Sequence, residues 1–431
     1  MRCCVYKERA ILSERVKLAM GGNRSNPNVI EVIDIACDEC PVTEISVGPS
    51  CRGCIAHRCM QACPKDAISI QNHRSVIDHS KCILCGRCMS ACPYGAIVKN
   101  MRPCEKNCPT KAISMGEDRK ASIDPEKCIS CGECTVQCPF GAIMDKSCIV
   151  EAIQLLMGAD TWGYHVYAAL APSFVGQFEG TVGQLVTALR QMGFYDVMEV
   201  ALGADITAQT EAAEFEERGG NMLSSCCPAF VEFVEKNLPA QAELLSKTPS
   251  PMVMTGRYIK ERDPHAKVVF IGPCVAKKME YQLGKTQGAI DCVVTFEELY
   301  AMMAGKGIEL TELEETPLDE ASGYGRAFAA SGGVAAAVAQ ALRERNSKIE
   351  AHGLACAGVE ECRAAILKMS RGLLPENFIE GMACALGGCV QGPAAIVRAP
   401  KNKAELTKHV KQAGERTIAQ SVRQAEETKG A

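Results

Sequence analysis

The sequence predicts two regions with different folds, a small cysteine-rich α+β region followed by a larger α/β region of two lobes. The first observation is the distribution of the 27 cysteines, of which 17 lie between Cys37 and Cys148 and only eight after residue 149. The second is the pattern after residue 160, where apolar segments alternate with amphipathic ones, as in sheets flanked by helices. The third is length, because 431 residues suggest two or three domains at about 150 residues each.

The composition shift sets the expected domain boundaries. They give an N-terminal extension over residues 1–36, a cysteine-rich domain over 37–150, an α/β domain over 151–400 and a C-terminal helical tail over 401–431. In the α/β domain, the candidate strands are 164–170, 196–202 and 268–272, and the candidate helices are 182–192, 229–236, 296–303 and 334–345. The tail is expected to be one charged helical stretch over about 402–426, with disorder as the alternative and fraying at 428–431.

Composition also narrows the class of protein. A hydrophobic fraction of 47% with 23% charged residues is ordinary for a globular protein, and a net charge of −4 gives no reason to expect nucleic acid as a partner. The first residues lack the apolar stretch of a signal peptide, and no run of about 18 apolar residues could span a membrane. We therefore expect a cytoplasmic protein, in which so many cysteines indicate metal binding rather than disulfides.

A repeated cysteine pattern dominates the first region. The pattern Cys-x-x-x-Cys-Pro-x-x-Ala-Ile occurs four times, at Cys59/Cys63, Cys88/Cys92, Cys104/Cys108 and Cys134/Cys138. Two copies extend to Cys-x2-Cys-x2-Cys-x3-Cys-Pro, the spacing by which bacterial ferredoxins bind 4Fe-4S clusters. Zinc binding by Cys-x-x-Cys pairs is the alternative, but zinc sites lack the third cysteine and the Cys-Pro sequence.

The cysteines can be assigned to clusters in groups of four, because the last cysteine of such a run binds the neighbouring cluster. Three groups are Cys51, Cys54 and Cys59 with Cys92; Cys82, Cys85 and Cys88 with Cys63; and Cys128, Cys131 and Cys134 with Cys108. A fourth cluster would use Cys104, Cys138, Cys37 and Cys40, with Cys3, Cys4 and Cys148 as rival ligands or free thiols. Clusters held by four thiolates conduct electrons but have no open position for a substrate. A terminal site is therefore expected in the second region.

Three segments of the second region are candidates for that site. They are Ser225-Cys226-Cys227-Pro228, Pro273-Cys274-Val275-Ala276-Lys277-Lys278-Met279-Glu280 and Glu380-Gly381-Met382-Ala383-Cys384-Ala385-Leu386-Gly387-Gly388-Cys389. Following the cysteine array, they resemble the active-site signatures of iron-only (FeFe) hydrogenases, and the resemblance covers about residues 37–400. It implies a bacterial-ferredoxin-like domain followed by an FeFe-hydrogenase catalytic domain, with reversible reduction of protons to hydrogen as the activity of a ferredoxin hydrogenase.

The resemblance also implies the ligands of the terminal site. Cys227, Cys274, Cys384 and Cys389 would hold a 4Fe-4S cluster, and Cys389 would bridge it to a diiron unit with carbon monoxide, cyanide and azadithiolate ligands. Cys226 matches the thiol that donates the proton, a role suited to a group that gives up and regains a proton without binding iron. A buried structural cysteine is the alternative for Cys226.

Further residues are implied by position. Glu211, Glu214 and Ser246 resemble the proton relay, with a solvated helix face as the alternative for the two carboxylates. Lys277, Ala171-Pro172-Ser173 and Ser250-Pro251 match the positions that surround the cyanide ligands, which need donors because an unpaired buried anion is costly. Phe328 and the turn Ser331-Gly332-Gly333-Val334 resemble the segment that packs over the diiron unit.

Departures from the commonest pattern indicate a divergent monomeric subgroup. Gly272 stands where Met is usual, Met252 where Gln is usual, and four residues separate Cys384 from Cys389 where three are usual. A ferredoxin or similar low-potential carrier and diiron-site maturation enzymes are the implied partners. A hydrogen or redox sensor and a non-catalytic iron-sulfur scaffold are the alternative functions.

Overall fold

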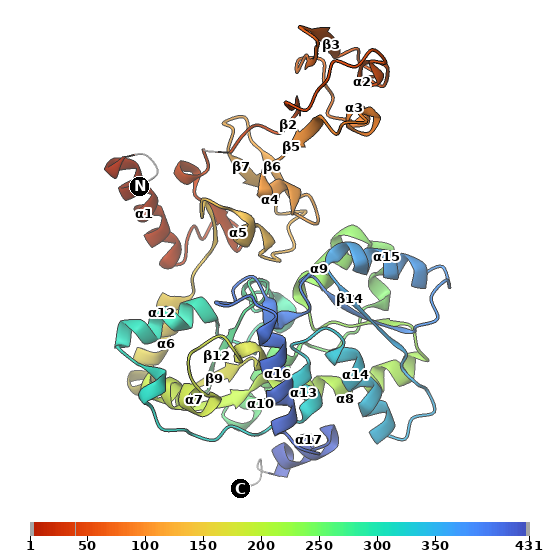
Figure 1. Cartoon of the computed structure of the whole chain (residues 1–431). Helices are drawn as coiled ribbons and strands as arrows, with labels where there is room; N and C mark the ends of the chain where they lie inside the picture. The colour runs from red at the N-terminus through yellow and green to blue at the C-terminus, as the bar shows by residue number, and fades with distance from the viewer. Residues whose placement is uncertain (1–3, 39, 428–431) are drawn as a thin grey trace.

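The computed structural model describes residues 4–38 and 40–427, which form an arm that projects from a larger body (Figure 1). We call residues 4–145 the arm and residues 149–427 the body. The arm contains the cysteine repeats, and the body contains both parallel sheets. The predicted fold class, a ferredoxin-like α+β region followed by an α/β domain with sheets flanked by helices, is confirmed.

The arm consists of two lobes of antiparallel strand pairs and short helices, the outer lobe lying farthest from the body (Figure 1). The outer lobe contains β2 (Glu44–Val47), α2 (Arg58–Gln61), β3 (Ile68–Gln71), β4 (Arg74–Ile77), α3 (Arg87–Ala91) and β5 (Ile97–Asn100). The inner lobe contains α4 (Pro103–Lys106), β6 (Ile113–Met115), β7 (Ala121–Ile123), α5 (Glu133–Gln137) and β8 (Ile143–Asp145). The inner lobe is completed by α1 (Val5–Ala19), β1 (Ile30–Val32), which pairs with β8, and the short 3-10 helix η1 (Asp34–Ala36).

The body has two parallel sheets, one in each lobe. The four-stranded sheet has the order β10 (Asp196–Glu199), β9 (Val166–Leu170), β12 (Lys267–Gly272), β13 (Cys292–Thr295). The three-stranded sheet has the order β11 (Met222–Leu223), β15 (Phe378–Met382), β14 (Gly353–Ala357). Strands β12 and β15 are buried along almost their whole length, as expected for parallel strands covered on both faces by helices.

Twelve helices are described in the body. They are α6 (Ile149–Trp162), α7 (Val182–Gln191), α8 (Val200–Arg218), α9 (Pro228–Asn237), α10 (Pro251–Arg262), α11 (Lys277–Glu280), α12 (Phe296–Lys306), α13 (Gly323–Ala327), α14 (Gly333–Glu344), α15 (Val359–Met369), α16 (Lys401–Gln412) and α17 (Ile418–Glu427). Short 3-10 helices are η2 (Pro172–Phe174), η3 (Pro239–Leu244), η4 (Gly284–Thr286), η5 (Leu310–Glu312) and η6 (Cys389–Gln391).

Helix α8 joins the two lobes, because it packs on α10 on one side and on α14 on the other. Its contact with α10 depends on Gly203, where a Cβ atom would lie 2.1 Å from Oγ1 of Thr255 and 2.4 Å from the carbonyl oxygen of Pro251. No larger residue fits there unless the two helices separate. This close contact helps to place the start of α8, with Val200 and Ala204, at the wall of the cavity described below.

Two predicted elements differ from the structure. The predicted strand 196–202 ends at Glu199, and Val200–Leu202 form the first turn of α8, whose buried apolar residues are hard to tell from a strand. The predicted single tail helix is two helices, separated by a turn in which Gly414 has a φ of +62°. Helix α17 buries Ile418 and Ser421, so the tail is ordered to residue 427, and the predicted fraying at 428–431 lies outside the described residues. Within the described part of the chain, no helix combines the length and apolar character needed to cross a membrane.

Candidate functional site

The outer lobe of the arm gathers two of the predicted cysteine groups around two small cavities. Cys51, Cys54, Cys59 and Cys92 line one cavity of about 20 Å³. Cys63, Cys82, Cys85 and Cys88 line the other, also of about 20 Å³. In each cavity three cysteines come from one run and the fourth comes from the other run, as the exchange of the fourth ligand predicts.

The inner lobe brings the other two groups together. Burial, and then the neighbouring thiols Cys128 and Cys108, raise the pKa of Cys131 to about 12. Burial likewise raises the pKa of Cys104 to about 11, with contributions from Cys138 and Cys37. Burial also raises the pKa of Cys40, and the nearby thiols of Cys37 and Cys138 add to this effect. Thiolates gathered in this way repel one another, so each group needs a cationic centre.

The repeated pattern has a local structural reason. In each of the four copies, the amide N–H of the alanine donates a hydrogen bond to Sγ of the cysteine four residues earlier, at 3.2–3.4 Å. The residue before each alanine, Asp66, Gly95, Lys111 or Gly141, has a positive φ. This left-handed turn directs the amide at the sulfur, and such bonds stabilise a metal-bound thiolate.

One of the rival ligands lies away from these groups, because Cys148 is beside Cys292 and Glu151 where the arm joins the body. Cys4 is exposed at the start of α1, and Cys3 lies outside the described residues. The predicted ligands Cys37 and Cys40 lie near Cys104 and Cys138, respectively.

The inner lobe packs directly on the body at Gly132. A Cβ atom there, where φ is +81°, would lie 2.6 Å from Cγ of Pro393 and 3.0 Å from Cγ2 of Val275. The ammonium of Lys236 donates to the carbonyl oxygen of Cys128 at 2.7 Å. One cysteine group of the arm thus abuts the cysteines of the body.

The four predicted ligands in the body come together although they are spread over 163 positions; they are Cys227, Cys274, Cys384 and Cys389. Burial raises the pKa of Cys384, and the nearby thiols of Cys389, Cys227, Cys274 and Cys131 add to the effect. Cys131 belongs to the arm, so the last cysteine group of the arm and the body group are neighbours. Such an arrangement suits electron transfer between two clusters.

A cavity of about 80 Å³ with mostly apolar walls, called the apolar cavity below, lies beside the body cysteines. Of the predicted residues, Ala171, Pro172, Ser173, Cys226, Cys227, Pro251, Cys274, Lys277, Phe328 and Cys389 line it, whereas Ser250 and Cys384 do not. The remaining lining is apolar apart from backbone and sulfur, and includes Val200, Ala204, Phe270 and Met382. An apolar cavity bordered by thiols and by an ammonium could hold an anionic, thiolate-bound metal unit.

Lys277 is a buried cation beside this cavity. Its ammonium donates to Ser250 Oγ at 2.9 Å, to the carbonyl oxygen of Cys226 at 3.3 Å and to Glu280 Oε2 at 2.6 Å. Burial by itself lowers the pKa of Lys277, but the negative charges of Glu280 and Cys274 outweigh it, so the pKa is raised and the side chain stays charged. Ser250 therefore acts on the site through Lys277.

The predicted relay residues lie in a row leading away from Cys226. Glu211 is completely buried, and its Oε1 accepts hydrogen bonds from N and Oγ of Ser225, both at 3.3 Å. Burial raises the pKa of Glu211 to about 7, and burial together with the charge of Glu211 raises the pKa of Cys226. The other carboxylate oxygen of Glu211 is buried without a hydrogen-bond partner among the described residues.

The outer half of the row centres on Glu214. Ser246 Oγ donates to Glu214 Oε2 at 2.7 Å and also counteracts the rise in the pKa of Glu211. Burial raises the pKa of Glu214, but hydrogen bonds from Lys247, Ser246 and Thr248 lower it by more. At neutral pH, Glu211 is thus about half protonated, whereas Glu214 at the outer end of the row is charged.

This row borders a second cavity, of about 510 Å³. Ser225, Ser246 and Glu280 line it together with exposed Lys247 and Glu243, so it opens to solvent. Arg218 holds the outer end of the row with an ion pair to Glu214 at 2.5 Å. The sequence prediction missed Arg218, although its position four residues after Glu214 on a helix is a signal for such a pair.

One departure in the sequence has a steric explanation. A Cβ atom at Gly272 would lie 2.7 Å from Cε1 of Phe270 and 3.2 Å from Cβ of Ala171. The ring of Phe270, which lines the apolar cavity, therefore occupies the space that a side chain at residue 272 would need. The sequence prediction also missed Glu380, whose buried carboxylate accepts from the amides of Gly332 and Ala335 and so holds the turn that follows Phe328.

Comparison with known proteins identifies related families for both regions. Residues 164–393, more than half of the chain, match the family described as iron only hydrogenase large subunit, C-terminal domain. Residues 75–98 match a 4Fe-4S binding domain, and residues 102–142 match a 4Fe-4S dicluster domain. The arm therefore contains 4Fe-4S binding domains.

Individual relatives include both enzymes and assembly factors. The chain is 31% identical to Iron hydrogenase 1 of Clostridium pasteurianum, over 76% of this chain and 66% of that protein. It is 23% identical to the cytosolic Fe-S cluster assembly factor narfl of Xenopus tropicalis, over 57% of this chain and 63% of that protein. The chain thus spans slightly less than two thirds of the length of each. An apo FeFe-hydrogenase variant from Chlamydomonas reinhardtii has a similar fold, with a TM-score of 0.54 at 23% identity over 65% of this chain and 94% of that one.

Proposed function

Because the chain belongs to the iron-only hydrogenase large-subunit family, we propose that it is an FeFe hydrogenase that catalyses the reversible reduction of protons to molecular hydrogen. The observation that carries the proposal is the apolar cavity that Cys226, Cys389 and Lys277 line together. A thiol for proton donation, a thiolate for metal attachment and a buried cation for anionic ligands are the three groups that this chemistry requires. A scaffold that only stores clusters needs neither Cys226 nor Lys277.

The residues present fit the cofactor of the family. Cys227, Cys274, Cys384 and Cys389 would hold a 4Fe-4S cluster, and Cys389 would attach the diiron unit with its carbon monoxide, cyanide and azadithiolate ligands. When bound, that unit would supply an electron-rich iron at which protons and electrons combine. Lys277 and the η2 segment Pro172–Phe174 would surround its ligands, and Phe270 and Phe328 would exclude water from it.

The row from Cys226 to Glu214 would deliver the protons. The raised pKa of Cys226 keeps the thiol protonated, so it is a donor at neutral pH. Glu211, with a pKa of about 7, is half protonated there and can return a proton to Cys226. Ser246 and Glu214 would pass protons inward from the solvent-filled cavity, which makes these residues a relay rather than a solvated helix face.

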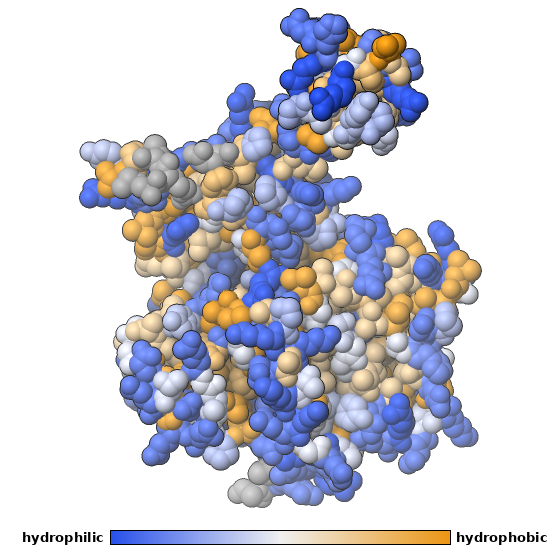
Figure 2. Space-filling model, in the orientation of Figure 1, coloured by the Kyte–Doolittle hydropathy of each residue, from blue (hydrophilic) through white to orange (hydrophobic). Residues whose placement is uncertain are grey.

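The arm would carry the electrons, in up to four 4Fe-4S clusters. Residues 48–100 contain seven Lys and Arg but only two Asp and Glu, whereas the whole chain has a net charge of −4. Arg52 and Arg58 are exposed on the outer lobe, where Figure 2 shows many hydrophilic residues. A basic tip of this kind suits an acidic carrier such as a ferredoxin. We place this partner, the diiron-site maturation enzymes and a cytoplasmic location within the same proposal.

Infrared spectroscopy of the anaerobically matured protein tests the proposal, together with a hydrogen-evolution assay on the same sample. We expect carbonyl and cyanide bands, and turnover that falls by about 10²–10⁴-fold in Cys226→Ala while the bands remain. Cys356→Ala, a buried cysteine outside the cavity, is the control and should keep its turnover. Bands without turnover in the wild type would favour a sensor. Full cluster content without bands, after competent maturation, would favour the iron-sulfur scaffold that some of its relatives represent.

A further inference from the structure

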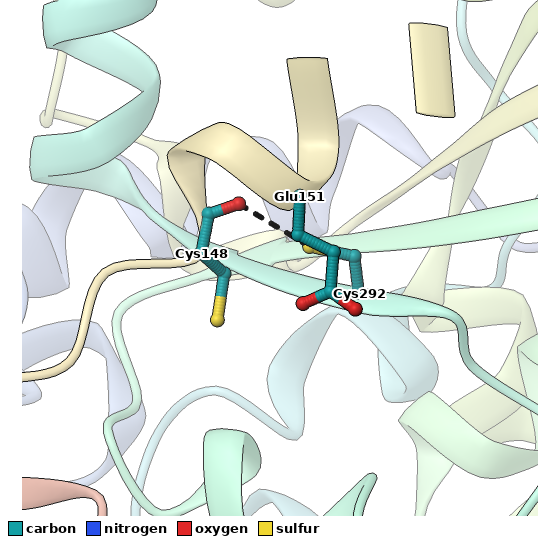
Figure 3. Close-up of side chains that lie close together, drawn as sticks. All are labelled: Cys148, Glu151 and Cys292. Atoms are coloured by element: carbon teal, nitrogen blue, oxygen red, sulfur yellow. Dashed lines mark hydrogen bonds between the residues drawn. The ribbon is translucent and has the colours of Figure 1, made fainter. Parts of the chain in front are cut away.

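Two cysteines that belong to none of the cluster groups meet where the arm joins the body. Cys148 immediately precedes α6, and Cys292 begins β13 (Figure 3). Their sulfur atoms and a carboxylate oxygen of Glu151 all lie within 4.8 Å of one another. The two thiols are 144 positions apart in the chain, so the fold alone brings them together.

The two thiols differ in their hydrogen bonding. Cys292 Sγ donates to the carbonyl oxygen of Cys148 at 3.6 Å, which is the dashed line in Figure 3. Interaction with the Cys292 thiol, and then the ammonium of Lys278, lower the pKa of Cys148, although burial, Glu298 and Glu151 oppose them. The same pairing and burial raise the pKa of Cys292. Cys148 is thus the more acidic thiol of the pair, and Cys292 is the less acidic one.

The more acidic thiol, that of Cys148, is also the more accessible one. Cys148 lines a cavity of about 240 Å³ between the arm and the body, whereas Cys292 does not and is completely buried. The cavity is also lined by Arg24, Lys146 and Lys278. A thiolate at the wall of a cationic cavity is positioned to react with an anionic electrophile from solvent.

We propose that Cys148 and Cys292 form a thiol–disulfide pair that reacts with small anionic disulfides at the joint between arm and body. The thiolate of Cys148 attacks one sulfur of the small disulfide, forming a mixed disulfide and releasing one thiolate. Cys292 then loses its proton and attacks the Cys148 sulfur, so that the second small thiol leaves. The two protein thiols are oxidised to one disulfide, and one small disulfide is reduced to two thiols.

A divalent metal ion is the main competing occupant of this site. Two thiols and a carboxylate are suitable ligands for zinc. However, three cationic side chains line the adjoining cavity, and Cys292 uses its proton to bond a carbonyl oxygen. Both features oppose a divalent cation and favour free thiols.

The chain contains a matched control pair. Cys356 and Cys362 are also buried, and a hydrogen bond with the thiol of Cys362 lowers the pKa of Cys356. Cys362 Sγ donates to the carbonyl oxygens of Cys356 and Met382, both at 3.8 Å. Neither lines any of the cavities described above. The two pairs therefore have similar thiol chemistry but different access to solvent.

The test is to incubate the cluster-loaded protein anaerobically with glutathione disulfide, block free thiols by alkylation, and map disulfides by mass spectrometry. We expect the Cys148–Cys292 disulfide to form at least tenfold faster than any Cys356–Cys362 disulfide. Cys292→Ala should accumulate a mixed disulfide on Cys148, and Cys148→Ala should leave Cys292 unmodified. In the wild type, the disulfide should also slow hydrogen exchange at residues 146–150.

Three results would overturn the proposal. The first is equal reactivity, or equal inertness, of the two pairs in the wild type, which needs no variant to fold. The second is a stable mixed disulfide on Cys148 in the wild type, because then Cys292 does not resolve it. The third is one zinc per chain that is lost in Cys292→Ala, because the site is then a metal site.

Discussion

The outer lobe of the arm and the body depend on different sources of stability. The buried core of the outer lobe has six residues, of which Cys59 and Cys88 are two, and its strands have four residues each. The core around the four-stranded sheet of the body has 35 residues. So small a core cannot offset the loss of chain entropy, so we infer that metal clusters fold the outer lobe whereas apolar packing folds the body.

Removing the clusters should give the largest effect. Anaerobic chelation of iron should unfold the outer lobe, because metal binding there supplies the folding free energy, while both sheets of the body persist. Hydrogen exchange followed by mass spectrometry would report this as full exchange over 44–100 and protection retained in β9 and β12. Protection that survives in β3 and β4 after complete loss of iron would show that the outer lobe folds without metal.

A cavity in the body should have the converse effect. Phe230 is 1% exposed and lies so close to Gly381 that a Cβ there would be 2.3 Å from its ring. Phe230→Ala should lower the free energy of unfolding of the body by about 3–5 kcal/mol, measured by denaturant titration, without loss of iron from the outer lobe. Val231→Ala, at a half-buried neighbour, is the control and should cost less. A parallel loss of iron from both regions would contradict independent stabilisation.

The pH dependence of stability should reflect Glu211. Its pKa rises from 4.5 to about 7 in the folded protein, so its contribution to stability is complete below about pH 4.5 and is lost as pH rises towards 7. The difference corresponds to about 3 kcal/mol. Glu211→Gln should therefore flatten the fall in thermal midpoint between about pH 5 and 7. An unchanged slope would mean that folding does not raise the pKa of Glu211.

Loss of one cluster of the outer lobe should have the smallest effect and should separate the regions functionally. Cys54→Ala should slow hydrogen evolution driven by reduced ferredoxin by about tenfold, since one of the two clusters that would receive electrons in the outer lobe is then lost. Exchange of deuterium between hydrogen and water requires only the body, so it should continue at the wild-type rate. Equal loss of both activities would argue against electron transfer through the arm.

The two regions also differ in how far sequence predicts them. Three cysteine groups of the arm could be predicted from spacing, because ligands on one loop lie a few residues apart and the repeat specifies its own partner, whereas the fourth was predicted with rival ligands left open. The strands and helices that were predicted in the body lie within a few residues of the observed ones, except at Val200–Leu202, where buried apolar residues belong to either element. Glu211 and Ser246 were found by resemblance rather than by spacing.

The sequence by itself therefore determined three of the cysteine groups, the order of the two regions and the three segments around the apolar cavity. Only the tertiary structure decided that Phe270 fills the space beside Gly272, that Arg218 holds Glu214, and that Cys148 meets Cys292 at a cationic cavity. The reason is the separation along the chain of the residues on which each feature depends. Ligand loops and turns depend on neighbours within a few residues, whereas a cavity wall or a thiol pair depends on segments that pack together from distant parts of the chain.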